Sequence, residues 1–261
     1  MSNPRCLVVI PTYNEIENIF LVVPAVLDQV EGFELLIVDD GSPDGTGDAV
    51  LSMQSKYEGR LHLLSRAGKL GLGTAYLDGF RWGLDRNYDF LFEMDADFSH
   101  NPKDLPRLLK PALAGKADVV VGSRYTKGGK VENWPFDRIF LSYGASLYVR
   151  TITWMPVKDP TAGFKCYRRE VLEAMNLDGI RFIGYAFQIE MKFRAWQLGF
   201  KVEEVPITFV DRTAGVSKMS SGIVKEAVFG VLQMRFTSAE KKSVPDRVTP
   251  LEDTAKSSGA S

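Results

Sequence analysis

Short apolar runs recur along the first half of the chain and predict strands that are buried on both faces. They comprise Cys6 to Ile10, Phe33 to Val38, Leu61 to Ser65, Phe90 to Met94 and Val119 to Val121. Segments with helical periodicity lie between them: Glu15 to Val30, the residues after Asp44-Gly45-Thr46, Thr74 to Leu84, and Lys103 to Ala114. Continuous apolar runs are typical of parallel strands with helices over both faces. The alternation predicts an α/β fold with a mostly parallel, doubly wound sheet.

The second half of the chain is less regular, but it carries two apolar segments with helical character. Phe136 to Trp154 predicts a long helix that is apolar almost all round, and Gly222 to Phe236 predicts an amphipathic helix. The other predicted elements are a strand at Phe164 to Tyr167, a helix at Ala186 to Leu198 and a strand at Val202 to Val210. A proline inside the first helix, Pro24, predicts a kink or break there. We expect one domain over residues 1–237 and a disordered polar tail over 238–261.

Composition and charge exclude several classes of protein. Hydrophobic residues make up 45% of the 261 positions and charged residues 25%, as is usual for a soluble globular chain. Lys and Arg number 32 against 33 Asp and Glu, so no overall basic field is present to hold nucleic acid. The two cysteines, Cys6 and Cys166, form no metal or redox motif and suit the cytoplasm. The longest uncharged stretches fall short of the roughly 18 apolar residues that a membrane span needs.

Carboxylate-bearing segments follow three of the predicted strands. They are Pro11 to Glu15, Asp39 to Ser42, and Asp95-Ala96-Asp97. Asp and Asn are also common in turns, so any single segment of this kind is weak evidence for a site. Ligands of open α/β sheets bind beyond the carboxyl ends of the strands. Three such segments at equivalent positions therefore favour a ligand site over three unrelated turns.

The third of these segments has the outline of a site for a hard cation. Two neighbouring carboxylates, Asp95 and Asp97, repel each other unless a cation or a proton lies between them. Mg²⁺ takes one or two carboxylates and completes its shell with water and substrate phosphates, so the pattern predicts a diphosphate ligand. A glycine-rich segment, Gly68 to Gly73, matches neither a P-loop nor a dinucleotide fingerprint. It is either a tight turn before a helix or a turn that also brings Lys69 to a phosphate.

The order of the motifs resembles a known enzyme family. The matching segments are Pro11 to Glu15, Asp39 to Thr46, Gly71 to Tyr76, Met94 to His100, Gly122 to Tyr125, Gly184 to Gln188, Glu204 to Pro206, and Phe209 to Arg212 with Ser217-Lys218. Together they are similar to the dolichyl- and polyprenyl-phosphate mannose synthases, which are GT-A (Rossmann-like) glycosyltransferases of family 2. The resemblance covers about Cys6 to Phe236.

This resemblance implies a donor pocket for GDP-mannose and a divalent metal, Mg²⁺ or Mn²⁺. The residues that would line or shape the guanosine pocket are Pro11, Tyr13, Glu15, Asp39 and Asp40. Asp95 and Asp97, separated by Ala96, would bind the metal that bridges the diphosphate. Some relatives carry a glutamine ligand two residues further on, where this chain has Ser99.

It also implies an acceptor, the phosphate of a polyprenyl (dolichyl) lipid. Arg212 and Lys218 would lie on a loop that closes over the diphosphate, and Arg124 and Arg138 would hold the lipid phosphate. The alternative for each of these two arginines is an ordinary salt bridge at the protein surface. A phosphate monoester is already largely ionised at pH 7, so it needs no base, and Glu190 is not assigned that role.

A lipid acceptor gives the two apolar helical segments a function. Helices rich in aromatic and apolar residues lie well in the interface of a membrane, which favours a peripheral protein at its cytoplasmic face. The alternatives are a packed core helix, a contact with a membrane-anchoring partner protein, or a contact with another domain.

The sequence leaves four candidate functions open. The first is an inverting, metal-dependent transfer of mannose from GDP-mannose to polyprenyl monophosphate, giving a β-linked lipid and GDP. The second is a polyprenyl-phosphate glucosyltransferase that uses UDP-glucose. The third is a transferase directed at hydroxyl groups, and the fourth is a catalytically inactive nucleotide-binding subunit.

Overall fold

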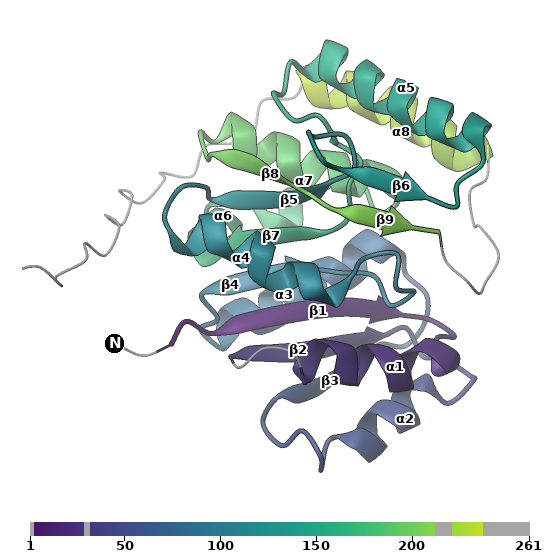
Figure 1. The fold of residues 1–261 in the computed structure, drawn as a ribbon, viewed down its shortest axis with the longest axis vertical. Coiled ribbons are helices and arrows are strands. Elements are labelled where there is room, and N and C mark those ends of the chain that lie inside the picture. The colour runs from purple at the N-terminus through teal and green to yellow at the C-terminus, as the bar shows by residue number, and fades with distance from the viewer. Residues whose placement is uncertain (1–2, 29–31, 212–220, 237–261) are drawn as a thin grey trace, which may run out of the picture.

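A seven-stranded sheet runs through the computed structural model, which describes residues 3–28, 32–211 and 221–236 (Figure 1). The strand order is β3-β2-β1-β4-β7-β5-β8. The bounds are β1 Cys6–Thr12, β2 Phe33–Asp39, β3 Leu61–Ser65, β4 Phe90–Glu93, β5 Val119–Ser123, β7 Lys165–Arg168 and β8 Val202–Pro206. Only β7 pairs antiparallel with its neighbours, β4 and β5, and every other pair in this sheet is parallel. The prediction of a mostly parallel sheet is confirmed.

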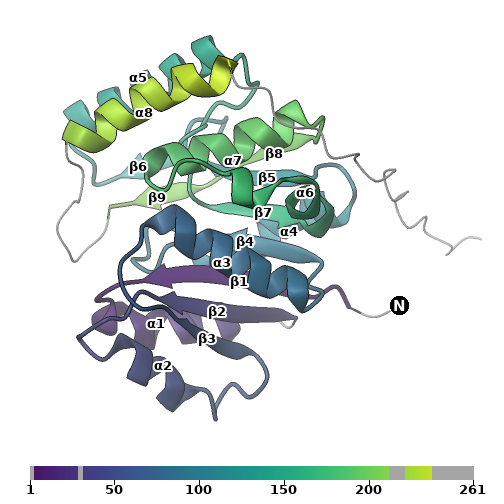
Figure 2. The same cartoon turned by 180° about the vertical axis from the view of Figure 1, so that it is seen from behind.

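Helices cover both faces of the sheet, as Figures 1 and 2 show from opposite sides. Their bounds are α1 Ile16–Leu27, α2 Thr46–Met53, α3 Leu72–Asp85, α4 Leu105–Leu113, α5 Phe136–Thr153, α6 Arg169–Ala174, α7 Tyr185–Gln197 and α8 Ser221–Phe236. The side chains of β1 divide between the two cores. Val8 and Ile10 pack with α1, α2 and α4, whereas Leu7 and Val9 pack with α3 and α7. A strand that buries both faces has to be apolar at every position, which explains the continuous runs in the sequence.

Two glycines bring α3 against the sheet. A Cβ atom at Gly79 would collide with the side chain of Val9, and one at Gly83 would lie 2.6 Å from Leu91 Cδ2. Both positions therefore need glycine, because any larger residue would push the helix away from β1 and β4.

Helices α5 and α8 lie side by side as an additional layer over α7 (Figures 1 and 2). A third apolar cluster joins them to the domain; it includes Val149, Met155, Phe193, Val231 and Met234. The predicted helix at 136–154 is thus present to within one residue. No helix within the described ranges has both the length and the apolar character that a membrane span requires.

The structure corrects two predictions of secondary structure. The segment Val202 to Val210 is two strands, because β8 ends at Pro206 and β9, Thr208–Val210, pairs with β6, Lys130–Glu132, in a separate two-stranded sheet. Ile207 connects the two sheets, since its N–H donates to Ser123 and its carbonyl accepts from Lys130. Helix α1 runs through Pro24 without a break. The predicted tail at 238–261 lies outside the described residues.

Candidate active site

The predicted site segments come together at one edge of the sheet. Strands β1, β2, β4, β5 and β8 all end at this edge, to which the β1 arrowhead points in Figure 1. The register aligns Thr12 with Asp39 and Val9 with Glu93, so the segments after β1, β2 and β4 are neighbours. Strand β7 is antiparallel and begins where the others end, which brings Lys165 to the same edge.

Asp39 is a structural carboxylate at the end of β2. It is buried and accepts hydrogen bonds from Thr12 Oγ1 at 2.9 Å and from Ser42 Oγ at 2.6 Å. The backbone N–H of Ser42 donates to its other oxygen at 2.9 Å. These bonds join the segment after β1 to the segment after β2, so Asp39 shapes the edge of the site.

Asp40 pairs with an arginine that the sequence analysis missed. Arg66 Nε donates to Asp40 Oδ1 at 2.7 Å, and Arg66 Nη1 donates to Thr74 and Asp78 at 3.0 Å. The second terminal nitrogen, Nη2, is buried and has no hydrogen-bond partner among the described residues. A buried donor without an acceptor is uncommon and points to an oxygen that a ligand supplies. Arg66 directly follows β3, so the rule that identified the other strand-end segments would also have found it.

Tyr13 and Lys69 meet at the same edge. The Lys69 ammonium lies 4.9 Å from the centroid of the Tyr13 ring. Gly71 has a φ of +107° at the start of α3, so the glycine-rich segment is a tight turn as well as the carrier of Lys69. Pro11 lies within β1, and the Glu15 carboxylate accepts from Asn18 at 2.7 Å in the first turns of α1.

The Asp95-Ala96-Asp97 segment is held by buried neighbours. Tyr76 donates its hydroxyl to Asp95 Oδ1 at 3.1 Å, and the Asp95 N–H donates to His100 Nδ1 at 3.1 Å. Burial is the main cause that lowers the pKa of His100, so the ring is neutral and its Nδ1 is a hydrogen-bond acceptor. His100 therefore orients the segment through its backbone.

The donor set of this segment fits a hard divalent cation. The Asp97 carboxylate accepts the Ser99 N–H at 3.0 Å, and the Ser99 hydroxyl is buried without a partner among the described residues. Within those residues no group of three or more His, Cys, Asp or Glu side chains converges. Two carboxylates are the protein share that Mg²⁺ or Mn²⁺ uses when substrate phosphates and water complete the shell. Ala96 is buried between the two.

A buried ionic network lies beneath the acidic segment. Glu93 and Lys165 face each other across β4 and β7, with 3.0 Å between Glu93 Oε2 and Lys165 Nζ. Tyr167 donates to the other Glu93 oxygen at 3.0 Å, and Lys165 also donates to Gln188. Burial lowers the pKa of Lys165, an effect that the nearby Glu93 carboxylate opposes. The network fixes the end of β4, which Asp95 follows. Gln188 has a structural role in it as the acceptor of a hydrogen bond from Lys165.

Arg124 lies at the end of β5 and is committed to a buried carboxylate. Its Nε and Nη2 donate to the two oxygens of Asp159 at 2.8 and 2.6 Å, and Nη2 also donates to Thr161 at 2.8 Å. The Asp159 side chain is fully buried. Burial alone would raise the pKa of Asp159, but the charge and hydrogen bonds of Arg124 outweigh that effect and lower it.

Arg138, in the first turn of α5, lies in a different setting. Its Nη1 donates to both oxygens of Asp211 at 2.9 Å, and its guanidinium lies 4.2 Å from the centroid of the Trp134 ring. Arg124 lies 5.5 Å from the same ring. The structure therefore brings the two predicted acceptor arginines together around one indole.

Glu190 serves as an anchor within the fold. One of its oxygens accepts the N–H groups of Arg181 and Phe182 at 3.0 Å, and the other accepts Arg194 Nε at 2.9 Å. The carboxylate is buried and holds the segment that leads into α7. This environment does not suit a general base that must reach a sugar hydroxyl.

Two predicted site residues, Arg212 and Lys218, lie outside the described residues. The described chain approaches them through β9, which ends at Val210, and through Asp211. Their positions remain predictions.

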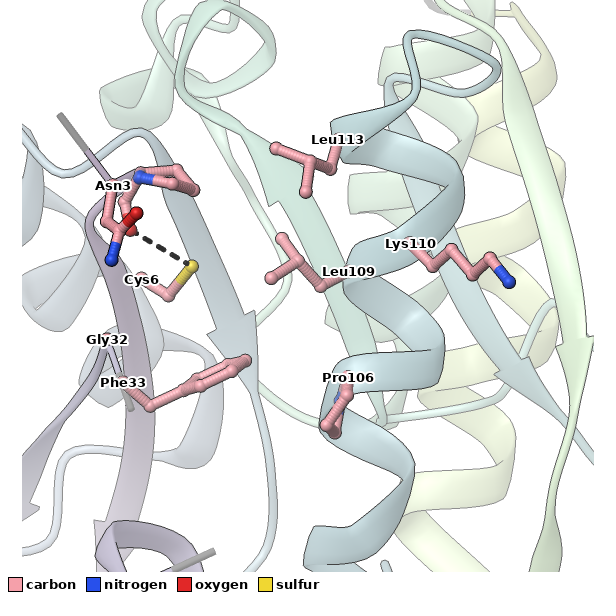
Figure 3. A pocket seen from close by; sticks show the side chains of 9 residues that line it. Asn3, Cys6, Gly32, Phe33, Pro106, Leu109, Lys110 and Leu113 are labelled. Atoms are coloured by element: carbon pink, nitrogen blue, oxygen red, sulfur yellow. Dashed lines mark hydrogen bonds between the residues drawn. The ribbon is translucent and has the colours of Figure 1, made fainter. Parts of the chain in front are cut away.

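A small pocket at the opposite edge of the sheet offers no chemistry of this kind (Figure 3). Phe33, Leu109 and Leu113 are among the apolar side chains that line it, and the Lys110 ammonium points away from it. The Cys6 thiol donates to the Pro4 carbonyl at 3.9 Å. The pocket lies between the amino ends of β1 and β2 and helix α4, far from the acidic segment.

Solved structures share this fold. Glucosyl-3-phosphoglycerate synthase from Mycobacterium tuberculosis, in complex with Mn²⁺, UDP-glucose and phosphoglyceric acid, matches with a TM-score of 0.63 and 19% identity over 89% of this chain and 80% of that chain. The same enzyme with Mn²⁺, UDP and phosphoglyceric acid matches with a TM-score of 0.67 and 19% identity, over 94% and 81% of the two chains. At this identity the likeness concerns the fold, which is GT-A, as the sequence predicted.

Sequence comparisons are more specific. The profile of glycosyl transferase family 2 matches residues 7–175. An undecaprenyl-phosphate mannosyltransferase from Micrococcus luteus is 50% identical over 227 residues, which cover 87% of this chain and 92% of that protein. A polyprenol monophosphomannose synthase from Mycolicibacterium smegmatis is 50% identical over 229 residues, which cover 88% and 86%. The chain therefore belongs to glycosyl transferase family 2, in the group that contains these two polyprenyl-phosphate mannosyltransferases, and the resemblance seen in its motifs is confirmed.

Proposed function

We propose that the protein transfers mannose from GDP-mannose to a polyprenyl (dolichyl) monophosphate and releases GDP. The observation that carries this proposal is the meeting, at one sheet edge, of the Asp95-x-Asp97 segment with Arg124 and Arg138. The first would hold a cation beside a diphosphate, and the second would bind a phosphate through its guanidinium groups. The two relatives at 50% identity, both named for mannosyl transfer to polyprenyl phosphates, support the same reaction.

On the donor side, the nucleoside would bind at the ends of β1 and β2. Pro11, Tyr13, Glu15, Asp39 and Asp40 would line or shape the pocket, with Lys69 beside Tyr13. A carboxylate suits the N–H donors on the edge of guanine, and the buried Arg66 Nη2 suits a carbonyl oxygen of a base. The pair formed by Asp40 and Arg66 therefore offers both an acceptor and a donor to a nucleobase.

Asp95 and Asp97 would hold Mg²⁺ or Mn²⁺ next to the diphosphate. The bound metal would neutralise charge on the diphosphate and so stabilise GDP as a leaving group. Tyr76 and His100 hold Asp95 in place through hydrogen bonds. Arg212 and Lys218 would add positive charge over the same diphosphate.

On the acceptor side, the lipid phosphate is its own nucleophile. An oxygen of the phosphate attacks the anomeric carbon of mannose, a new carbon–oxygen bond forms, and the bond to the GDP oxygen breaks. Attack from the face opposite GDP inverts the α-linked donor to a β-linked product. Because a phosphate monoester has a second pKa near ~6, no protein base has to remove a proton. The anchoring role of Glu190 agrees with this reaction.

The outer surface of α5 and α8 would bring the enzyme to its lipid. Exposed apolar side chains cover it: Phe136, Phe140, Leu141, Tyr143, Leu147, Trp154, Phe229 and Phe236. Such a surface suits the cytoplasmic interface of a membrane, where aromatic rings lie well. Arg138 is in the first turn of α5, so the acceptor phosphate would be bound where this surface meets the sheet edge. A membrane-anchoring protein or domain is the alternative occupant.

The reaction can be tested directly with radiolabelled GDP-mannose and polyprenyl phosphate in detergent, with Mg²⁺, with Mn²⁺ and with EDTA. We expect a metal-dependent labelled lipid that resists mild alkali and is cleaved by mild acid.

Binding to a membrane is tested separately, with phosphatidylglycerol vesicles that are sedimented after incubation with the protein. The wild-type protein should sediment with the vesicles, and a Phe136→Ser, Phe140→Ser variant should remain in the supernatant. Recovery of both proteins in the supernatant would exclude the membrane surface as the site of binding.

UDP-glucose is the alternative donor, because the likeness of fold extends to an enzyme that was crystallised with it. The same assay with UDP-glucose separates the two donors. Product from UDP-glucose alone would keep the acceptor and the chemistry and change the sugar. Absence of product from both donors, with the acceptor and each metal present, would contradict the proposed activity.

A further inference from the structure

The guanidinium of Arg138 is already paired with a carboxylate of the protein, that of Asp211. Both oxygens of Asp211 lie 2.9 Å from Arg138 Nη1. The two side chains are 28% and 26% exposed, so water and ligands reach the pair. An ion pair in such a position contributes little net stability and exchanges partners readily.

The backbone fixes Asp211 in front of Arg138. The N–H of Asp211 donates to the carbonyl of Glu132 at 3.1 Å, which continues the ladder between β6 and β9 by one residue. Arg138 in turn rests on the Trp134 ring. The carboxylate and the guanidinium are therefore held by separate elements, a strand end and a helix start, and their contact depends on charge.

We propose that Asp211 occupies on Arg138 the place of the acceptor phosphate and exchanges with it during the reaction. This inference rests on the proposed function, in which Arg138 binds that phosphate. A phosphate monoester carries a charge of about −1.5 to −2 at pH 7, so it outcompetes a carboxylate of charge −1. An alcohol has no charge with which to displace Asp211, so the carboxylate selects for a phosphorylated acceptor.

The exchange reverses when the sugar is transferred. The acceptor phosphate forms one new ester bond and becomes a phosphodiester, which retains a single negative charge. Asp211 then competes for Arg138 on equal terms in charge, and its strand already holds it in position. The carboxylate thereby weakens the binding of the phosphodiester product to Arg138 and favours its release.

The test is the isosteric substitution Asp211→Asn, with farnesyl phosphate as a short acceptor. We expect the KM for farnesyl phosphate to fall about three- to tenfold, because Arg138 loses its internal anion. Inhibition by farnesyl methyl phosphate, a phosphodiester, should strengthen by about the same factor, because both ligands displace the same carboxylate. A loss of folding cannot produce tighter binding, so this outcome would be specific.

Asp178→Asn is the matched control. It removes the same charge from a pair with Arg81, 2.6 Å apart, on an exposed surface outside the site. An equal fall in KM in both variants would reduce the effect to overall charge and overturn the inference. An unchanged or raised KM in Asp211→Asn would also overturn it. Asp211→Ser, with binding of farnesyl phosphate measured by calorimetry, covers the case in which the asparagine variant folds poorly.

Arg138→Ala separates this inference from the proposed function. If it leaves the KM for farnesyl phosphate unchanged, Arg138 does not bind the acceptor and the inference about Asp211 fails with that role, whereas the mannosyl transfer itself stands. If it raises that KM while Asp211→Asn does not lower it, the acceptor role of Arg138 stands and the exchange with Asp211 is wrong.

Discussion

Two arginines near the Trp134 ring pair with carboxylates that differ in burial. The side chains of Arg124 and Asp159 are 9% and 0% exposed, whereas those of Arg138 and Asp211 are 28% and 26% exposed. The Asp159 carboxylate accepts three hydrogen bonds from Arg124, one from the backbone N–H and two from the guanidinium, whereas Arg138 donates to Asp211 through one nitrogen, Nη1. Burial thus distinguishes two arginines to which the sequence analysis assigned the same role.

The difference assigns each pair a different task. A buried pair cannot release one member, because the other charge would remain uncompensated in a medium of low dielectric. Arg124 therefore organises the end of β5. It would contact substrate without leaving Asp159. Arg138 is able to exchange its partner, since water screens both charges.

The largest expected effect comes from breaking the buried pair. Asp159→Ala leaves the Arg124 charge buried without a partner and should lower the free energy of unfolding by about 3–5 kcal/mol. Asp211→Ala, the matched change at the exposed pair, should lower it by about 1 kcal/mol or less. Urea denaturation of the full chain measures both. Similar losses in the two variants would remove the distinction between the pairs.

The next effect concerns acceptor binding. Arg138→Ala should raise the KM for polyprenyl phosphate about 10- to 100-fold, because hydrogen bonds between charged groups contribute about 1.5–3 kcal/mol. The affinity for GDP-mannose, measured by calorimetry, should stay within a factor of about two of wild type, since this substitution leaves the donor residues intact. Arg81→Ala is the control for lost surface charge. A parallel loss of donor and acceptor affinity would contradict the acceptor role.

A smaller effect is expected from the indole between the two arginines. Trp134→Leu removes the ring that faces both guanidinium groups and should raise the acceptor KM about threefold, as expected for a partly exposed cation–π contact of about 0.5–1 kcal/mol. Trp134→Phe keeps a ring and should recover most of the affinity. If leucine and phenylalanine behave alike, the ring has no part in holding Arg138.

The smallest effect expected near neutral pH is a change in the free energy of unfolding that the Arg124–Asp159 pair contributes. The pKa of Asp159 is lowered from its ordinary value of 3.8, since Arg124 outweighs the effect of burial. The stabilisation is therefore fully present above 3.8 and is lost as the pH falls through the lower folded-state pKa. The difference in unfolding free energy between wild type and Asp159→Asn should be constant from pH 7 to 5 and shrink below 3.8. A difference that shrinks between pH 7 and 5 would exclude this titration.

Most of the proposed donor-binding residues could be predicted from the sequence, because the patterns that mark them are local. Each of these parallel strands is a mostly apolar run with polar residues at its end or shortly after it, as Asp39 and Asp95 show. Arg66 obeys the same rule and was missed because a lone basic residue stands out less than paired acids. The motifs around Arg124 and Arg138 identified those residues without revealing that their partners are Asp159 and Asp211, which lie 35 and 73 positions away.

The remaining differences have physical causes that a one-dimensional pattern does not contain. Strand β6 has three residues with exposed or half-exposed side chains, so no apolar signal marks it. The division of the segment 202–210 depends on which sheet offers Ile207 its hydrogen bonds. The antiparallel direction of β7 is set by its two neighbours in space, since an apolar run reads alike in either direction.

That one reversed strand divides the sheet into two blocks of parallel strands, β3-β2-β1-β4 and β5-β8. Every residue assigned to the nucleotide base lies in a strand of the first block or shortly after one, and both acceptor arginines follow β5 in the chain. The donor and acceptor residues thus come from different parts of one continuous sheet. A chimera that joins residues 3–118 to the second half of a relative with a different acceptor should retain its sugar donor and change its acceptor.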